Sequence, residues 1–380
     1  MFAKNTKKNI DGQISNVICN SAKQGLIPQR EYFDKDIANS DNTTGYYIIE
    51  ENDFVYNPRK STDAPYGPIS SYKNAEAGIV SPLYLCFRAK KEINPSFFEW
   101  YFRSSVWHRY VYISGDSGAR HDRVSIKDDT FFAMPINLPS APEQEHISSF
   151  LEKIDLRIEM QRDLVENLKK YKRGLLFHEF GSKACSEADC KFVGRINEFF
   201  HLSSGSTPSS TNKAYYSGNI NWVSSGELKP KYLLETIQHI SCEAVINCNL
   251  KEYPANTLLI AMYGLEAAGV RGTASILSVP ATISQACMAI QQTGGIDIEY
   301  LYYWYMFNGQ WIGVRIAQGT KQQNLSTETL GNLRICAPST EKQKEVCSFL
   351  SDIDKIIENE TQLIELLTSV KKGLLQQLFI

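Results

Sequence analysis

The chain has 380 residues, 43% of them hydrophobic, and a formal net charge of −2 that comes from 40 basic and 42 acidic residues. This length and composition are typical of a globular protein with two domains, each large enough to bury its own core. The near-neutral balance neither predicts nor excludes a polyanionic partner, so any nucleic-acid binding must come from local basic patches.

No apolar run approaches the roughly 18 residues of a membrane span, and the start MFAKNTKKNIDG lacks an apolar signal region. We therefore expect a cytoplasmic protein with no membrane partner. The nine cysteines show no paired short spacing, which suits a reducing compartment. Cys185 and Cys190 lie near His178 and His201, but their spacing fits no strong zinc pattern, and we expect no metal site.

Residues 1–138 alternate short runs of β-branched and aromatic residues with turn residues, which predicts a mixed α/β domain. The runs 45–59 and 77–88 are typical of strands. Residues 96–111, SFFEWYFRSSVWHRYV, predict one aromatic-rich helix instead.

A long segment with a helical pattern follows, and a second copy of it occurs near the end of the chain. PSAPEQEHISSFLEKIDLRIEMQRDLVENLKKYKRGLLFHEF begins at Pro139, and PSTEKQKEVCSFLSDIDKIIENETQLIELLTSVKKGLLQQLF begins at Pro338. Aligned without a gap, about two fifths of the positions are identical, which indicates an internal repeat. Gly174 and Gly373 sit near the far ends, where helices tend to stop.

Both copies place apolar residues at heptad spacing, which predicts one apolar seam along each helix. The seam residues are Leu151, Ile154, Ile158, Val165, Leu168, Leu350, Ile353, Ile357, Ile364 and Leu367. Gln161 and Glu360 interrupt the two seams at the same place, as do Lys172 and Lys371. The helices can pair parallel or antiparallel. An antiparallel pairing puts the two lysines towards the ends, where their stems cover the seam and their ammonium groups reach water. An amphipathic helix packed on a globular core is the alternative.

Residues 183–337 predict a second mixed domain, with NINWVSSGELK at 219–229 and NTLLIAMYG at 256–264 as its clearest segments. The two domains align weakly, and their best match is a loop: GARHDRVS at 118–125 lies opposite GTKQQNLS at 319–326. Arg and Lys suit phosphates and guanine, and Asn and Gln suit adenine. A solvated turn explains the same residues. Trp222 is better explained as core than as a base-stacking surface.

Catalytic motifs are absent from the sequence. No amino-methyltransferase motif and no glycine-rich nucleotide loop occurs, so neither a methyl donor nor ATP has an evident site. Glu227 and Lys229 resemble the end of a nuclease metal site, but residues 202–221 contain no acidic partner. We expect this chain to be no enzyme.

In the order and duplication of these segments, the chain resembles the DNA specificity subunits of type I restriction-modification systems. The matching segments are the two copies PSAPEQEHISSFL and PSTEKQKEVCSFL, the opening GSTPSS with NINWVSSGEL, and FVYNPR, GIVSPLY, GARHDRVS and GTKQQNLS. One departure is that the first domain lacks a counterpart to FVGRINEFFHLSSGSTP, so either its start is truncated or its opening strand differs.

The resemblance implies a mixed α/β fold with a pseudo-two-fold repeat: target-recognition domains at 1–138 and 183–337, with spacer helices at 139–182 and 338–380 forming an antiparallel coiled coil. Each domain is expected to read one half of a bipartite double-stranded DNA target. The residues expected to contact DNA are Asn57, Arg59, Lys60, Arg120, His121, Arg123, Ser224, Tyr263, Arg271, Lys321, Gln322 and Asn324.

The resemblance also implies partners. Two methylation subunits would dock on the helices and restriction subunits would join them, with S-adenosylmethionine, ATP and Mg²⁺ bound by those partners and no cofactor in this chain. Two alternatives stay open: a specificity subunit of another restriction-modification class, and a coiled-coil scaffold that joins two protein-binding domains without DNA.

Overall fold

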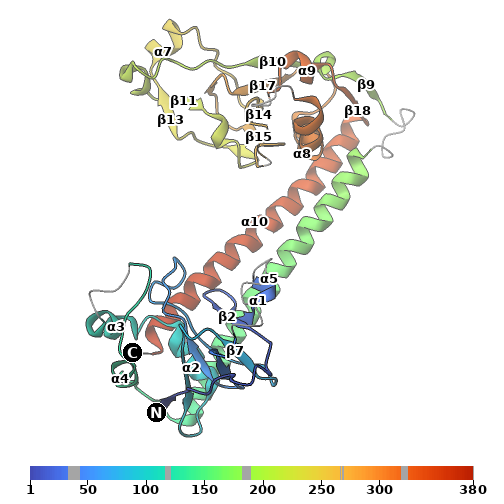
Figure 1. Cartoon of the computed structure of the whole chain (residues 1–380). Coiled ribbons are helices and arrows are strands. Elements are labelled where there is room, and N and C mark those ends of the chain that lie inside the picture. The colour runs from blue at the N-terminus through green and yellow to red at the C-terminus, as the bar shows by residue number, and fades with distance from the viewer. Residues whose placement is uncertain are drawn as a thin grey trace. The chain divides into compact units, whose positions relative to one another are not determined.

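The computed structural model describes residues 1–32, 43–115, 121–181, 190–265, 267, 269–317 and 324–379. The chain divides into two compact units: unit 1 comprises Met1–Arg162 with Gln362–Ile380, and unit 2 comprises Asp163–Thr361. Each of the two long helices seen in Figure 1 contributes one half to each unit. No helix of the described residues has both the length and the apolar character that crossing a bilayer requires.

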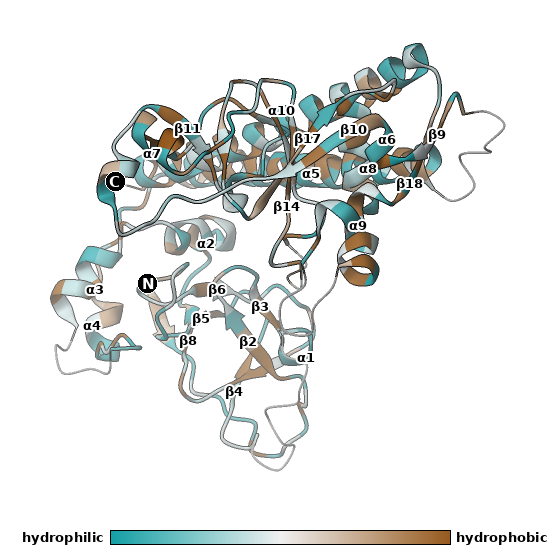
Figure 2. Cartoon of the chain, turned by 90° about the horizontal axis from the view of Figure 1, so that it is seen from above, coloured by the Kyte–Doolittle hydropathy of each residue, from teal (hydrophilic) through white to brown (hydrophobic). Residues whose placement is uncertain are grey.

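Unit 1 is built on short strands. Its elements before the long helix are β1 (Phe2–Lys4), β2 (Ile18–Ser21), β3 (Gly25–Pro28), α1 (Gln29–Tyr32), β4 (Tyr47–Ile49), β5 (Phe54–Tyr56), β6 (Ile69–Ser71), β7 (Gly78–Val80), β8 (Leu85–Ala89), α2 (Pro95–Arg103), α3 (His108–Ser114) and α4 (Asp128–Phe132). An antiparallel sheet has the order β1-β8-β5-β6, accompanied by the hairpin β2-β3 and the pair β4-β7. β4, with the sequence Tyr-Ile-Ile, stands out as hydrophobic in Figure 2.

Aromatic side chains form the core of unit 1. The ring of Phe2 lies edge-on to that of Phe98 on α2, with ring centres 5.1 Å apart, and Phe54 stacks on Phe87 at 5.5 Å. Such ring pairs add about 0.5–1.5 kcal/mol to the area that they bury. They join α2 to the sheet.

The single helix expected at 96–111 is wrong, because α2 ends at Arg103 and α3 starts at His108. Asn94 caps α2 by accepting from the Phe97 amide at 3.0 Å, and Pro95 follows at the first helical position. At the other end the Trp107 indole donates to the Phe102 carbonyl at 3.0 Å. This bond closes the helix and buries the indole, which periodicity alone does not predict.

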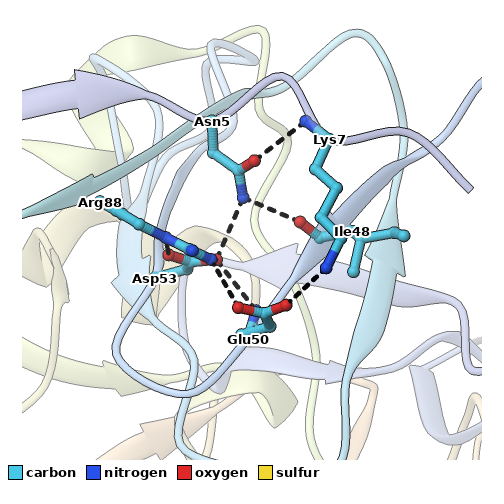
Figure 3. A network of polar contacts seen from close by, with 6 residues as sticks. All are labelled: Asn5, Lys7, Ile48, Glu50, Asp53 and Arg88. Carbon is cyan, nitrogen blue, oxygen red and sulfur yellow. Dashed lines mark hydrogen bonds and ion pairs between the residues drawn. The ribbon is translucent and has the colours of Figure 1, made fainter.

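A buried carboxylate ties the strands of unit 1 together (Figure 3). Asp53 is 1% exposed and accepts two bonds of 2.7 Å from the Arg88 guanidinium and one of 3.1 Å from the Asn5 amide. Arg88 and Lys7 also bind Glu50, at 3.0 and 2.9 Å. The hydrogen bond from Lys7 is the main reason why the pKa of Glu50 is lowered. These hydrogen bonds offset the free-energy cost of burying the Asp53 carboxylate.

Unit 2 repeats this plan with additions. Its elements between the long helices are β9 (Phe192–Arg195), α6 (Ile196–Phe199), β10 (Phe200–Ser204), η3 (Lys213–Tyr216), β11 (Ile220–Val223), η4 (Ser225–Glu227), β12 (Tyr232–Leu233), β13 (Gln238–Ile240), α7 (Cys242–Asn247), β14 (Leu258–Ala261), β15 (Ala274–Leu277), β16 (Thr282–Ile283), β17 (Cys287–Gln292), α8 (Ile298–Trp311), η5 (Ile312–Ile316), α9 (Thr327–Gly331) and β18 (Arg334–Ala337). The main sheet has the order β10-β17-β14-β15-β12, and smaller sheets are β13-β11-β16 and β18-β9.

The two sheets share one topology, since β1-β8-β5-β6 corresponds strand for strand to β10-β17-β14-β15. β1 therefore occupies the place of β10, pairing antiparallel with β8 as β10 pairs with β17. Of the two explanations for the missing opening segment, a truncated start or a different opening strand, the pairing supports the second, because β1 resembles β10 in pairing but not in sequence. Among the described residues of unit 1, β9 and α6 have no counterpart.

The two long helices expected from the repeat are present. α5 spans Ala141–Phe180 and α10 spans Thr340–Gln377. Both continue past Gly174 and Gly373, so these glycines do not end the helices as expected. All ten expected seam residues are buried or half-buried.

Within each unit the halves of α5 and α10 lie against each other and run in opposite directions. In unit 1, Asp155 binds Lys371 and Leu151 shares a hydrophobic cluster with Leu374. In unit 2, Lys172 binds Asp354, and Leu176 and Leu350 belong to one cluster. The lysines thus pair with carboxylates of the other helix instead of reaching freely into water, which corrects the expectation for these residues.

Candidate nucleic-acid interface

Two of the loops predicted from the sequence meet in unit 1. The segment after β5 and the segment at 122–124 form a short antiparallel contact, in which Arg59 lies opposite Arg123. The amide of Val124 donates to the Pro58 carbonyl at 2.9 Å, and the amide of Lys60 donates to the Asp122 carbonyl at 2.9 Å. Candidate residues that are far apart in sequence, Arg59 and Arg123, therefore share one surface.

This surface borders a cleft of about 720 Å³. The wall opposite the two loops is the β2-β3 hairpin with its turn, Ala22 to Gln24. The polar and aromatic residues that line the cleft are Asn20, Ser21, Lys23, Gln24, Tyr32, Asn57, Arg59, Lys60, Ser61, Asp63, Ser81, Tyr84 and Arg123. The sequence patterns did not predict Lys23, Gln24, Tyr32 or Tyr84 as part of the site. Gly25, which ends the hairpin turn with φ +71°, is the sequence feature that could have indicated a tight turn here.

The cleft is predominantly basic. Arg59 and Lys60 are exposed, and no described acidic side chain pairs with either. Lys23 lies 3.5 Å from Asp63, but both side chains are more than half exposed, so this pair contributes little stability. Burial raises the pKa of Tyr84, which keeps its hydroxyl neutral. Cationic groups and neutral donors on one concave wall fit a phosphate backbone.

Asn57 shapes the cleft rather than only lining it. Its side-chain amide donates to the Asn20 carbonyl at 3.2 Å, and its oxygen accepts from the Arg59 amide at 3.1 Å. Gly67 supports this arrangement, since its φ is +81° and a Cβ there would lie 2.1 Å from the Asn57 carbonyl oxygen. Asn57 thus joins the hairpin to the basic loop.

Arg123 has a guanidinium that is not fully satisfied. Its side chain is 38% exposed, while its Nε is buried and has no hydrogen-bond partner. Asp122 is 4.0 Å away, too far for a hydrogen bond. His121 beside it is exposed, and Arg120 lies outside the described residues.

Unit 2 places an equivalent pair of segments at the equivalent sheet edge. After β14, the Met262 carbonyl accepts from the Leu325 amide at 2.8 Å, as Pro58 accepts from Val124. Asn324 thereby takes the position of Arg123, and its Oδ1 is likewise buried without a partner. These two atoms are the only buried side-chain atoms of this kind in the described part of the chain. Lys321 and Gln322 lie outside that part.

The remaining candidates in unit 2 differ in their surroundings. Tyr263 follows β14 and is 37% exposed. Arg271 is half-buried, and its Nε donates to the Leu265 carbonyl at 2.7 Å, so it holds its own loop. Ser224 caps η4 by donating to Glu227 at 2.8 Å. Arg271 and Ser224 thus have structural partners within unit 2.

Glu227 is an internal hydrogen-bond acceptor. It is 8% exposed; one oxygen accepts from the Ser224 amide and hydroxyl, and the other accepts from the Ile237 amide at 2.7 Å. This arrangement stabilises the turn after β11. Trp222 is 6% exposed in a hydrophobic cluster with Ile240, as expected for a core residue.

The cysteines differ in part from the expectation of free thiols. Cys190 is disulfide-bonded, and Cys185 lies outside the described residues. Within the described ranges, no group of three or more His, Cys, Asp or Glu side chains is arranged to hold a metal ion.

Comparisons with known proteins point to one family. Residues 189–369 match the family model described as type I restriction modification DNA specificity domain. The chain is 29% identical over 192 residues to the type I restriction enzyme MjaIX specificity subunit of Methanocaldococcus jannaschii, and 25% identical over 251 residues to the EcoR124I/EcoR124II specificity subunit of Escherichia coli. The chain is therefore similar to the type I specificity subunits, and the family model covers residues 189–369 of it.

The fold agrees over the whole chain. A solved structure of a type I restriction-modification system covers 100% of this chain and 97% of that one, with a TM-score of 0.67 and 13% identity. The HsdS subunit from Thermoanaerobacter tengcongensis covers 99% of this chain and 93% of that one, with a TM-score of 0.56 and 15% identity. In sequence, the match to the Methanocaldococcus relative covers 50% of this chain and 43% of that protein. The match to the Escherichia coli relative covers 64% of this chain and 60% of that protein.

Proposed function

We propose that this chain is the DNA sequence-specificity subunit of a type I restriction-modification complex and that each unit reads one half of a bipartite target. One observation carries the proposal. Each sheet presents the same pair of loops at the same edge, joined by equivalent hydrogen bonds from Val124 to Pro58 and from Leu325 to Met262. Two copies of one reading surface suit a target with two halves.

The chemistry of these loops suits both parts of DNA recognition. Arg59, Lys60 and Lys23 provide cations for phosphates, which supply affinity without sequence information. Arg123 and Asn324 supply groups that pair with base edges, guanidinium with guanine and carboxamide with adenine. Because these two residues differ, the half-sites are expected to differ in sequence.

The long helices are proposed to form an antiparallel coiled coil that spaces the two reading surfaces. The buried or half-buried seam residues on α5 and α10 and the opposed directions of the helix halves in each unit support this arrangement. A stiff helix rises about 1.5 Å per residue, so it converts sequence length into a defined separation. The length of the helices would then determine the gap between the two half-sites.

The helices also offer surfaces for methylation subunits. On α10, Phe349, Ile356 and Val370 recur every seven or fourteen residues and are 45–50% exposed. On α5, Phe150 and Tyr171 are 49% and 54% exposed at the equivalent places in the repeat. Apolar stripes of this kind mark protein contacts. Two methylation subunits and the restriction subunits would supply S-adenosylmethionine, ATP and Mg²⁺ chemistry, while this chain holds DNA and catalyses no step.

The proposal is tested by sequencing modified bases in DNA from cells that carry this gene and its modification subunit, compared with cells that lack this gene. We expect a gained split motif with methyladenine in each half. A variant with Arg123→Ala is expected to relax or lose one half only. If the complex is stable but the DNA gains no methylated motif and the complex binds no DNA sequence selectively, the result would favour the alternative of a protein scaffold.

A further inference from the structure

Two Lys–Asp pairs recur at equivalent places of the internal repeat. Lys172 of α5 binds Asp354 of α10 in unit 2, and Lys371 of α10 binds Asp155 of α5 in unit 1. The repeat that aligns Pro139 with Pro338 also aligns each lysine with the other lysine and each aspartate with the other aspartate. Their side chains are only 17–36% exposed. The same Lys–Asp contact therefore occurs once in each unit.

In unit 2 the pair is part of a larger polar network. The Tyr303 hydroxyl of α8 donates to Asp354 at 2.9 Å, and Lys172 lies over the Tyr303 ring at 5.5 Å. Lys231 donates to the same hydroxyl at 2.8 Å and to Ser351 of α10 at 3.1 Å, and it also binds Glu299. The network joins both long helices to α8 of the recognition domain.

Unit 1 has a corresponding junction built from different residues. Lys371 lies 4.8 Å from the ring centre of Trp100 on α2, which occupies the place of α8. Arg103, also on α2, lies 3.7 Å from Asp155 and binds Glu99 at 2.5 Å. Glu99, whose side chain is 8% exposed, accepts from Ser71 of β6 at 2.7 Å. Ion pairs thus link α2 to both long helices, and the hydrogen bond from Ser71 to Glu99 links α2 to the sheet.

The side chains around Asp354 disfavour a shift of one helical turn between α5 and α10. Leu350 and Ile357 lie one turn before and after Asp354 on the same side of α10. A slip of one turn would therefore place the Lys172 ammonium against an aliphatic side chain and leave Asp354 without its cation. A half-buried charge that loses its partner is strongly destabilising, whereas an apolar seam alone tolerates slippage more readily.

We propose that Lys172–Asp354 and Lys371–Asp155 are positioning pairs that hold each recognition domain at one place along the helices and so select the gap between the two half-sites. This inference rests on the proposed function. The pairs touch no base. They act through helix register and through α2 and α8.

The test compares three full-length variants in complex with the modification subunits. The apolar variant carries Lys172→Met, Asp354→Leu, Lys371→Met and Asp155→Leu, and keeps the junction filled. The swap variant carries Lys172→Asp, Asp354→Lys, Lys371→Asp and Asp155→Lys, together with Arg103→Gln and Lys231→Gln so that the relocated lysines meet no neighbouring cation. The control carries Lys355→Met and Asp352→Leu, an α10 pair whose side chains are 69% and 63% exposed. Methylation is measured on DNA with the two half-sites at the preferred gap and at shorter and longer gaps.

We expect the apolar variant to remain folded but to lose about fivefold in its preference for the correct gap, the scale of coupling between contacting residues. The swap variant is expected to recover the preference, and the control to keep it. An apolar variant with unchanged preference would overturn the proposal, as would a swap variant that loses the preference equally.

A readout without DNA separates this inference from the proposed function. Spin labels introduced at the exposed Thr62 and Glu235 report the distribution of distances between the two units. It is expected to be narrow in the wild type, broad in the apolar variant and narrow again after the swap. A wild-type complex without a split target would refute the proposed function, while equal widths in all variants would refute the positioning pairs.

Discussion

Arg123 and Asn324 each bury a polar atom without a partner at equivalent positions of the two units. Leaving such a group unsatisfied costs about 1–3 kcal/mol, so both positions favour a bound form in which the side chain turns to a ligand. We expect Arg123→Ala to weaken binding of the cognate DNA by about tenfold or more and to relax one base position. The measurement is DNA binding by the complex at fixed salt concentration.

Lys91→Ala provides the matched control, because Lys91 is an exposed cation of unit 1 that does not line the 720 Å³ cleft. It is expected to leave base preference unchanged. Equal losses in both variants would mean that Arg123 contributes only general charge.

Gly67 holds the basic loop in place. Its φ of +81° is unfavourable for other residues, and a Cβ would lie 2.1 Å from the Asn57 carbonyl oxygen. We expect Gly67→Ala to lower the free energy of unfolding by about 2 kcal/mol or more. Gly12→Ala, with φ +65° and open space around it, should cost only about 1 kcal/mol. The comparison uses urea unfolding, and equal costs would contradict the close contact.

His108 makes unit 1 sensitive to acid. It stacks on Tyr66 with ring centres 4.6 Å apart, and burial lowers its pKa below the usual 6.5. The unfolded chain therefore binds the proton more readily, so stability is lost as the pH falls through 6.5 towards the folded pKa. We expect His108→Gln to reduce the fall in the urea midpoint between about pH 7.5 and 5.5. An identical pH dependence in both proteins would exclude His108 as the cause.

At the scale of elements, the repeat and its heptad spacing were enough to predict the long helices, because an apolar seam imposes the same constraint at every turn. The break between α2 and α3 was not predictable in this way. It depends on the Trp107 indole reaching the Phe102 carbonyl, a contact that is visible only after packing. The equivalence of β1 and β10 was missed for a related reason: hydrogen-bond pairing with a neighbouring strand defines it, not sequence.

The candidate site was predictable in part. Polar loops that follow strands indicated Asn57, Arg59 and Arg123, and the structure brings all three to one cleft. The opposite wall, with Lys23, comes from a hairpin whose distance from these loops no local pattern encodes. The bond from Ser224 to Glu227 was not predictable from the sequence, and contact of Ser224 with DNA stays a prediction.

The exposed stripe of α10 gives a prediction for one element. Ile356 is 45% exposed, so Ile356→Lys should leave the free energy of unfolding within about 0.5 kcal/mol of the wild type. Binding of the methylation subunit, measured by calorimetry, should weaken about tenfold or more if Ile356 lies in the contact. Glu358→Lys, an exposed change on the same helix, is the control. Equal retention of the partner by both variants would place its contact elsewhere.

At the scale of the whole molecule, the repeat places the same Lys–Asp contact in both units, although the proposed DNA-binding loops of the two units differ. The loops differ between the units, Arg123 against Asn324, while the Lys–Asp pairs are the same. Under the proposed function, variation in the loops would change the bases that are read, and constancy in the helices would preserve the distance between the two half-sites. The two properties therefore depend on different residues and are separable by mutation.

This separation predicts the effect of helix length. Seven residues inserted after Arg162 and seven after Thr361, at the boundaries of the two units, keep the seam in phase and leave both Lys–Asp pairs within their own units. Each helix grows by about 10 Å at 1.5 Å per residue. With base pairs about 3.4 Å apart, the methylated motif should gain about three base pairs in its gap and keep both half-sites.

Insertion into α5 alone is the control. It shifts one seam against the other and should abolish methylation at every gap, because no single register then satisfies both Lys–Asp pairs. Modified-base sequencing reads both outcomes. A motif with an unchanged gap after the double insertion would show that the separation of the half-sites is set by something other than the two long helices.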